Sequence, residues 1–176
     1  MAAVASRDEE RSSRALGSGA DPNFRDMDDQ EFTPLLMAVK SGSVELVRLL
    51  LRAGADPARG EASKMTPLMS AAKMGSEELV EALLPLSDAR ARSGAGMTAL
   101  LFGVLGGSAR CVEMLLPFSD IDSSSPVGSA RFLAGRFDRP DLAEFVEGEA
   151  ARREAREIGE AAARPELTSS SRPKAL

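Results

Sequence analysis

Apolar and polar positions recur along the chain with a period of 32 to 33 residues. Each unit starts at a threonine before an apolar run, and a glycine follows nine residues later. An apolar pair and then a double leucine complete the unit. The threonines and glycines of the three units are Thr33 and Gly42, Thr66 and Gly75, and Thr98 and Gly107. Because these features return together and in the same order, the chain contains a structural repeat.

The pattern inside each unit predicts two short helices. A threonine hydroxyl can accept hydrogen bonds from the free N–H groups at a helix start, and Pro34 and Pro67 suit the first helical position. Each glycine can adopt the left-handed conformation that ends a helix. Ser43, Ser76 and Ser108 follow the glycines and are expected to cap a second helix, whose apolar residues lie three and four apart. The unit is therefore helix, turn, helix and loop, and its apolar face needs a stacked neighbour.

These units resemble ankyrin repeats. The resemblance rests on the Thr-Pro-Leu segments at 33–35 and 66–68, the interhelical glycines, and the closing element at 52–57. Residues 18–23 match that closing element, so a truncated repeat is expected before the first full one. The resemblance implies an all-α ankyrin-repeat solenoid of about three full repeats plus degenerate terminal repeats, with a C-terminal helical extension.

A degenerate fourth unit is expected at 129–147. Pro140 fits the first turn of its second helix. Its buried side is expected to comprise Phe132, Leu133, Leu142, Phe145 and Val146. Two segments depart from the family pattern, because 83–88 and 115–120 carry a proline where the family has glycine and alanine. They agree with each other, which indicates a variant of the closing element.

Polarity divides the chain into four segments. Residues 1–14 and 164–176 are expected to be disordered, residues 15–147 form the ankyrin-repeat domain, and residues 148–163 form a charged helix. Pairs such as Glu149 and Arg153 support that helix by roughly 0.2–0.5 kcal/mol each. Two interpretations stay open for it: a solvated extension of the last helix, or a helix that binds a partner or joins two copies.

The composition narrows the function. The formal net charge is −5, which disfavours nucleic acid and anionic membranes as ligands, and no apolar run reaches the roughly 20 residues of a membrane span. The chain has no histidine, so histidine-based catalysis and histidine-ligated zinc are ruled out, and no cofactor is expected. A single cysteine, Cys111, is compatible with the cytoplasm, although a cysteine-poor secreted effector would look the same.

Several side chains are expected to be structural or solvent-facing. Cys111 occupies the apolar position held by Leu46 and Leu79 in the other repeats, so it is interpreted as a core residue and not as a nucleophile. Met37 and Met69 are also expected in the core. The expected solvent face of the second helices comprises Glu45, Arg48, Glu77, Glu78, Glu81 and Glu113.

Partners of the resembled family usually bind at the loop tips and inner helices, so those positions are the candidate site. The expected partner-binding residues are Phe32, Met65, Met97, Asp29, Gln30, Lys40, Lys73, Met74, Arg90 and Arg92. Phe32, Met65 and Met97 share the slot before the threonine. They either form an exposed apolar ridge that binds a partner or pack on each other and stiffen the tips. Charge substitution at these three positions is expected to abolish partner binding while helix content and melting temperature stay nearly unchanged. A large loss of stability would instead support packing of the tips.

Charges around the tips also differ between repeats. The first tip is acidic, with Asp26, Asp28, Asp29 and Glu31, whereas Arg90 and Arg92 precede the third repeat. Such a gradient could orient a partner, or each charge could belong to a solvated loop.

The leading hypothesis is a monomeric protein-protein interaction module, acting as an adaptor, inhibitor or effector that binds a protein partner. The alternative is a structural self-assembly unit joined through the C-terminal helix or an exposed repeat end. Catalysis by carboxylates is the least favoured reading, because no glycine-rich phosphate loop or metal-ligand spacing occurs.

Overall fold

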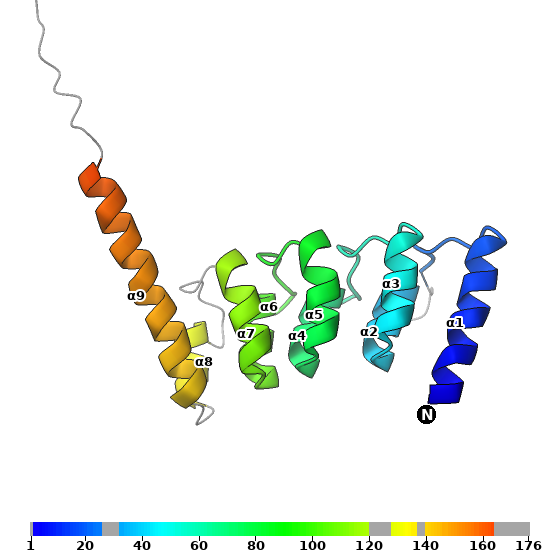
Figure 1. Cartoon of the computed structure of the whole chain (residues 1–176), viewed down its shortest axis with the longest axis horizontal. Coiled ribbons are helices and arrows are strands. Elements are labelled where there is room, and N and C mark those ends of the chain that lie inside the picture. The colour runs from blue at the N-terminus through cyan, green and yellow to red at the C-terminus, as the bar shows by residue number, and fades with distance from the viewer. Residues whose placement is uncertain (1, 26–31, 120–127, 137–139, 164–176) are drawn as a thin grey trace, which may run out of the picture.

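The computed structural model describes residues 2–25, 32–119, 128–136 and 140–163, and these residues form a row of stacked helices (Figure 1). The elements in chain order are α1 (Ala2–Gly17), α2 (Pro34–Ser41), α3 (Val44–Arg52), α4 (Pro67–Met74), α5 (Glu77–Leu83), η1 (Leu84–Leu86), α6 (Ala99–Gly106), α7 (Ala109–Leu115), η2 (Leu116–Phe118), α8 (Ala130–Arg136) and α9 (Pro140–Ala163). The predicted all-α solenoid is confirmed.

Local capping sets where the inner helices begin and end. The hydroxyl of Thr33 accepts a hydrogen bond from the Leu36 N–H, and Thr66 caps α4 in the same way. The Thr98 side chain makes no such bond. The three interhelical glycines have φ values of 77°, 68° and 74°, in the left-handed region, so they end α2, α4 and α6 as predicted.

Capping of the second helices follows the prediction with one exception. Ser43 and Ser108 accept hydrogen bonds from Leu46 N–H and Cys111 N–H, whereas Ser76 makes no side-chain cap bond. The helix that starts after Ser76 carries Glu77 in its first turn, and a carboxylate there interacts favourably with the helix dipole.

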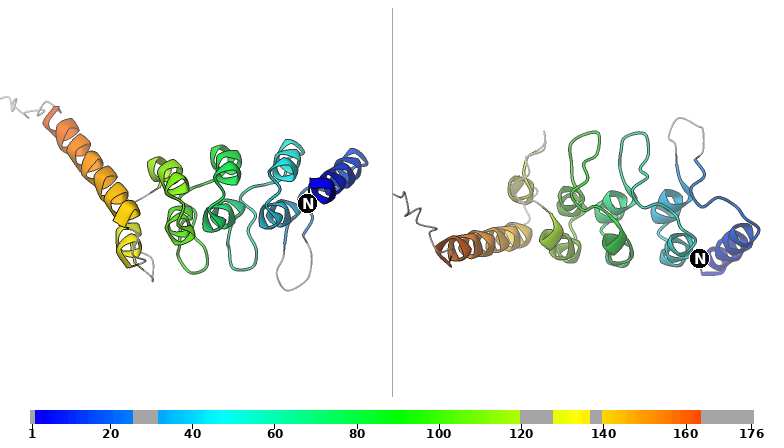
Figure 2. Two further views of the ribbon diagram at one scale, coloured as in Figure 1. Left: turned by 60° about the horizontal axis from the view of Figure 1, so that its bottom comes forward. Right: turned by 90° about the horizontal axis from the view of Figure 1, so that it is seen from above.

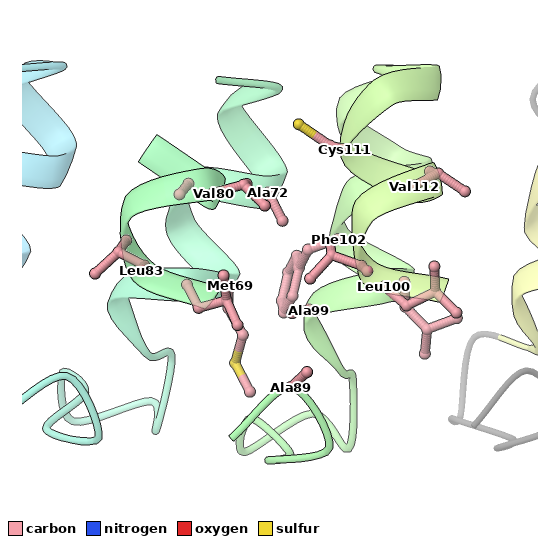
Figure 3. Close-up of a cluster of buried hydrophobic side chains, with 14 of the residues drawn as sticks. Met69, Ala72, Val80, Leu83, Ala89, Ala99, Leu100, Phe102, Cys111 and Val112 are labelled. Carbon is pink, nitrogen blue, oxygen red and sulfur yellow. The ribbon is translucent and has the colours of Figure 1, made fainter. Parts of the chain in front are cut away.

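The helices form two layers. The inner layer consists of α2, α4, α6 and α8, and the outer layer consists of α1, α3, α5, α7 and α9, with each helix contacting the next in its own layer. Figure 2 shows the loops between repeats projecting from one side as fingers. Leucine, valine, alanine and methionine side chains fill the space between the layers (Figure 3). Met69 and Cys111 lie in this core as predicted, and Cys111 is fully buried.

The N-terminal end differs from the prediction. Residues 1–14 were expected to be disordered, but α1 runs from Ala2 to Gly17 and contacts α3. Leu16 is partly buried against the core. Among the described residues, this end therefore contains an outer helix, α1, with no inner helix of its own. The chain turns after α1 at Gly19, whose φ is 90°.

The C-terminal end is a single long helix. The boundary expected at residue 147 lies inside α9, so the outer helix of the fourth repeat continues directly into the charged extension. The Arg153 guanidinium donates to the Ser119 carbonyl oxygen at 2.9 Å and also to that of Leu116. These bonds attach the extension to the turn after α7. The tail at 164–176 lies outside the described residues.

Three apolar residues expected in the core are exposed. In the fourth repeat Leu133, Leu142 and Val146 are buried as predicted, but Phe132 and Phe145 are exposed. Phe132 is exposed because no described inner helix follows α8 in the stack. Phe145 lies beside the buried stripe that Leu142, Val146 and Ala150 form at four-residue intervals on α9.

Met37 is the third exposed residue. It was expected in the core, but it lies on the side of α2 near Arg11 and Ser12 of α1, where no described inner helix covers it.

Candidate functional site

The slot before the threonine does not form an exposed ridge. Met97 retains only 6% of its exposure and belongs to the core, and Met65 packs against that core. Phe32 is half-buried. Met97 is held inward because Ser93 bonds it twice, with the Ser93 N–H donating to the Met97 carbonyl and the Met97 N–H donating to the Ser93 hydroxyl. The ridge interpretation is therefore wrong for Met97, whose side chain packs into the core.

Neighbouring fingers also support each other through their backbones. The Gly94 N–H donates to the Ser63 carbonyl oxygen at 2.7 Å. A Cβ atom on Gly94 would lie 2.9 Å from that oxygen, so the approach requires a glycine. The backbone groups of Ser63 and Gly94 are therefore engaged in the contact between the second and third fingers.

An ion pair joins the first repeat to the second finger. The Lys40 ammonium lies 2.8 Å from a Glu61 carboxylate oxygen and 4.0 Å from the centroid of the Phe32 ring. The Ser63 hydroxyl donates to the other Glu61 oxygen at 2.7 Å. Phe32, Lys40 and Glu61 thus form one stacked unit, in which the cation lies over the aromatic face.

The surroundings of Glu61 favour its charged form. Burial alone would raise the pKa of Glu61, but hydrogen bonds from Lys40 and Ser63, together with the positive charges of Lys40 and Lys73, outweigh burial and lower the pKa below its ordinary value. Glu61 is thus an ionised link between α2 and the second finger at neutral pH.

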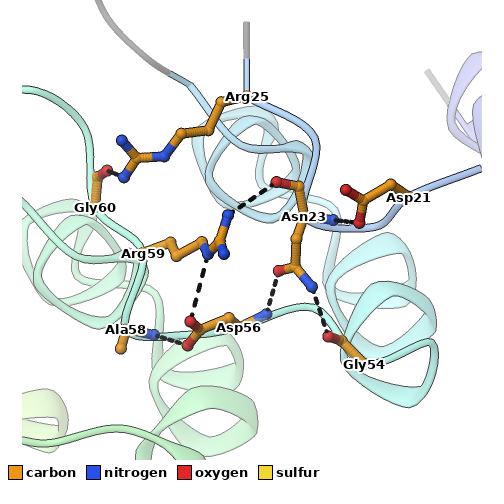
Figure 4. A network of polar contacts seen from close by, with 8 residues as sticks. All are labelled: Asp21, Asn23, Arg25, Gly54, Asp56, Ala58, Arg59 and Gly60. Atoms are coloured by element: carbon orange, nitrogen blue, oxygen red, sulfur yellow. Dashed lines mark hydrogen bonds and ion pairs between the residues drawn. The ribbon is translucent and has the colours of Figure 1, made fainter.

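A second network ties the truncated repeat to the first full repeat (Figure 4). The Asn23 side-chain amide donates to the Gly54 carbonyl at 3.0 Å and accepts from the Asp56 N–H at 2.7 Å. Arg59 donates to the Asn23 carbonyl and pairs with Asp56. This network ties the turn that follows α1 to the equivalent turn that follows α3.

A continuous exposed surface remains on the inner helices. It consists of the two residues before the terminal glycine in each of three repeats: Lys40 and Ser41, Lys73 and Met74, and Leu105 and Gly106. All of them are exposed, and Met74 and Leu105 keep 49% and 38% of their exposure. Because equivalent positions on stacked parallel helices lie side by side, these residues make one strip, which we call the inner strip.

The predicted charge gradient is only partly visible. Asp26, Asp28, Asp29, Gln30 and Glu31 lie outside the described residues. Arg90 is exposed, and its N–H donates to Asp88. The Arg92 guanidinium donates to the Gly96 carbonyl at 3.0 Å, so it braces its own finger.

Other candidate chemistry is weak in the described part of the chain. Burial raises the pKa of the Cys111 thiol, which keeps it protonated. No group of three or more metal-ligating side chains occurs among the described residues. None of the described helices is long and apolar enough to span a membrane. The charges expected on the solvent face of the outer helices are exposed.

Sequence reasoning missed two of the residues that shape this surface. Asn23 directly follows the Asp-Pro pair of the closing element. Its position in a repeated turn could therefore have indicated that it bonds the next repeat. Glu61 offered no such indication, because its partner Lys40 lies 21 residues earlier and meets it only after the repeats stack.

Fold and surface together define a helical-repeat solenoid with a strip of exposed side chains along its inner helices. A family model described as ankyrin repeats (3 copies) matches residues 1–93 and 59–126, and the chain belongs to the ankyrin-repeat family. None of the curated proteins compared with the chain matches it. Ankyrin repeats are generally protein-protein interaction modules.

Proposed function

We propose that this chain acts as an adaptor, inhibitor or effector that binds a protein partner along the inner strip. The observation that most directly supports this proposal concerns the two residues before the glycine that ends each inner helix. Both of them are exposed in three successive repeats. These exposed positions include two large apolar side chains, Met74 and Leu105. By contrast, the finger-tip residues that precede the threonines are partly or fully buried. An interaction surface combines an apolar centre with a polar rim, and the inner strip offers both.

The strip suggests how a partner is recognised. Met74 and Leu105 would form the apolar centre, and methionine adapts well to the shape of a partner. Lys40 and Lys73 lie at one end, where Glu61 already engages Lys40. Lys73 is therefore the cation best placed to meet a carboxylate of the partner and to accelerate encounter. Arg90 could add positive charge at the tips.

Affinity purification from the native source, read out by mass spectrometry, tests this proposal. The test variant carries Lys73→Glu and Leu105→Glu, and the matched control carries Glu78→Lys and Glu81→Lys on the exposed side of α5. The expected result is a stoichiometric protein recovered with the wild type and the control but lost with the test variant. Equal recovery by all three proteins, or no protein recovered by any of them, would overturn the proposal.

A further inference from the structure

Charge is divided unequally between the two layers of helices. The described inner helices α2, α4, α6 and α8 contain basic residues but no aspartate or glutamate, although the whole chain has a formal net charge of −5. By contrast, the outer helix α5 carries Glu77, Glu78 and Glu81 and no basic residue. The inner helices therefore carry only positive side chains on a protein that is acidic overall.

The exposed basic residues of the inner helices share one register position. The Ser129 hydroxyl accepts a hydrogen bond from the Phe132 N–H, as the Thr33 hydroxyl does at the start of α2, so positions in the fourth repeat can be counted from Ser129. The seventh residue after the cap is exposed in all four repeats, and these residues are Lys40, Lys73, Leu105 and Arg136. Arg136 thus continues the inner strip into the fourth repeat, and Leu105 lies between two cations.

Helix stability alone does not explain where these cations lie. A basic residue in the last turn interacts favourably with the helix dipole, but α5 and α7 have no basic residue in that turn. The chain therefore does not place a cation at every helix end. Lys40 already bonds Glu61 directly, whereas Lys73 acts on Glu61 only through its charge. The positions that distinguish the strip are therefore Lys73, Leu105 and Arg136.

The spacing of these three positions indicates the form of the segment that fits them. Each inner helix contacts the next, and packed helices lie about 8–10 Å apart. A chain in the polyproline II conformation has three residues per turn and rises about 3.1 Å per residue, so every third side chain returns to the same face after about 9 Å. Such a segment presents one side chain to each repeat. In a β-strand the third residue would face the opposite way.

We propose that repeats two to four bind an acidic, extended segment of the partner. In this segment an acidic residue, an apolar residue and a second acidic residue occur at every third position. The two carboxylates pair with Lys73 and Arg136, and the apolar side chain packs on Met74 and Leu105. This inference rests on the proposed binding role of the inner strip and specifies the chemistry of the partner.

The surface between the two cations favours a polypeptide over a nucleic acid. Single-stranded nucleic acids bind through aromatic side chains on which their bases stack, whereas Met74, Leu105 and Gly106 lie between Lys73 and Arg136. The net charge of −5 adds a repulsion that grows with the charge of the ligand. It therefore opposes a polyphosphate more strongly than a segment with two carboxylates.

Fluorescence anisotropy with labelled synthetic peptides tests the inference on the full-length protein. The probe carries glutamate, leucine and glutamate at every third position, with proline and alanine between them. One control peptide has lysine in place of both glutamates, and another has the same composition but places the three residues at every second position. The expected result is saturable binding of the probe, about tenfold or more tighter than that of either control. Binding of the probe should weaken as the salt concentration rises.

A pair of double variants locates the bound peptide. Lys73→Glu with Arg136→Glu is expected to weaken binding about tenfold or more, because both attractive charge pairs become repulsive. Arg48→Glu with Arg52→Glu is the matched control, since it makes the same change of charge at exposed residues of the outer helix α3. It is expected to change binding by less than about twofold. Thermal melts by circular dichroism check that both variants fold, and the peptide controls use the wild type alone.

Three results would overturn the inference: no saturable binding to the wild type, equal binding of the three peptides, or equal weakening in both double variants. Tighter binding of a labelled oligothymidylate, lost in Lys73→Glu with Arg136→Glu, would also overturn it, since the strip would then bind nucleic acid. The affinity purification tests the proposed function separately. If it recovers a protein that the strip variant loses while no acidic peptide binds, the strip remains a binding surface and only its acidic ligand is wrong. If both experiments fail, the proposed function falls as well.

Discussion

Gly106 on α6 lies directly against the Ala72 carbonyl oxygen on α4, so closely that a Cβ atom on Gly106 would be 2.5 Å from that oxygen. The Lys73 carbonyl oxygen would be 2.7 Å away. Both obstacles are backbone atoms, which cannot rotate aside as a side chain could. This contact sets how closely the second and third repeats stack, and it places a glycine on the inner strip for a structural reason.

Gly106→Ala is therefore expected to destabilise the protein by about 1–3 kcal/mol, as overpacking does in a rigid interface. Gly148→Ala is the control, because Gly148 lies within α9 with nothing within 4 Å of its Cβ position. That change is expected to stabilise by about 0.5–1 kcal/mol, since alanine favours helix. Urea unfolding curves measure both, and equal effects of the two changes would contradict the close approach.

Glu61 is expected to contribute pH-dependent stability. Because folding lowers its pKa, its contribution is complete well above the ordinary glutamate pKa of about 4.3 and is lost as pH falls through the lower value in the folded protein. Glu61→Gln should cost about 0.5–1 kcal/mol at pH 7 and almost nothing near pH 2. Thermal melts from pH 7 to pH 2 test this, and a constant difference across that range would refute it.

Asn23→Ala is expected to loosen the truncated repeat from the first full one. The change removes the donor to Gly54 and the acceptor for the Asp56 N–H, at a cost of about 1–2 kcal/mol. Hydrogen exchange should accelerate at the Asp56 amide and in α1, while exchange in α6 stays unchanged. Asn23→Asp keeps the acceptor, so it should protect the Asp56 amide better than alanine does.

Met97→Glu is expected to destabilise the fold by about 2–4 kcal/mol, because it places a charge in the core. This expectation replaces the sequence-based one, in which Met97 was a surface residue whose change would spare stability. Phe132→Glu is the comparison, since Phe132 is exposed, and it should change stability by less than about 0.5 kcal/mol. The melting temperatures of the two variants test this difference. An unchanged melting temperature for Met97→Glu would restore the ridge interpretation.

Arg153→Ala is expected to release the second half of α9 from the stack, because the Arg153 bonds to Leu116 and Ser119 attach it. Helix content by circular dichroism should fall, and amide exchange after Arg153 should accelerate while α4 and α6 keep their protection. Arg152→Ala is the control, since Arg152 pairs with Glu149 of the same helix. Identical amide exchange in both variants would show that the Arg153 hydrogen bonds are not needed to hold α9 against the stack.

The sequence by itself determined the helical unit, its boundaries and the order of the repeats. Thr33, Thr66 and the terminal glycines act on backbone groups a few residues away, so local chemistry is enough to place α2 and α4. The recurrence of one apolar pattern then required stacking, because a single unit cannot bury its own face. The core position of Cys111 followed from the same register.

Only the tertiary structure decided which of several equivalent positions reach the surface. Met37 and Phe102 share a register position but differ in exposure, because the inner helix α4 precedes the helix that carries Phe102, whereas no described inner helix precedes α2. Phe32 and Met97 share another position, but Met97 is buried in the core, whereas Phe32 is half-buried beneath the Lys40 ammonium. Lys40 and Glu61 meet only because stacking brings residues 21 apart within 2.8 Å. The exposure of a side chain and the partner it pairs with depend on which residues lie next to it in space. A repeated sequence specifies these neighbours better for its central repeats than for the repeats at its ends.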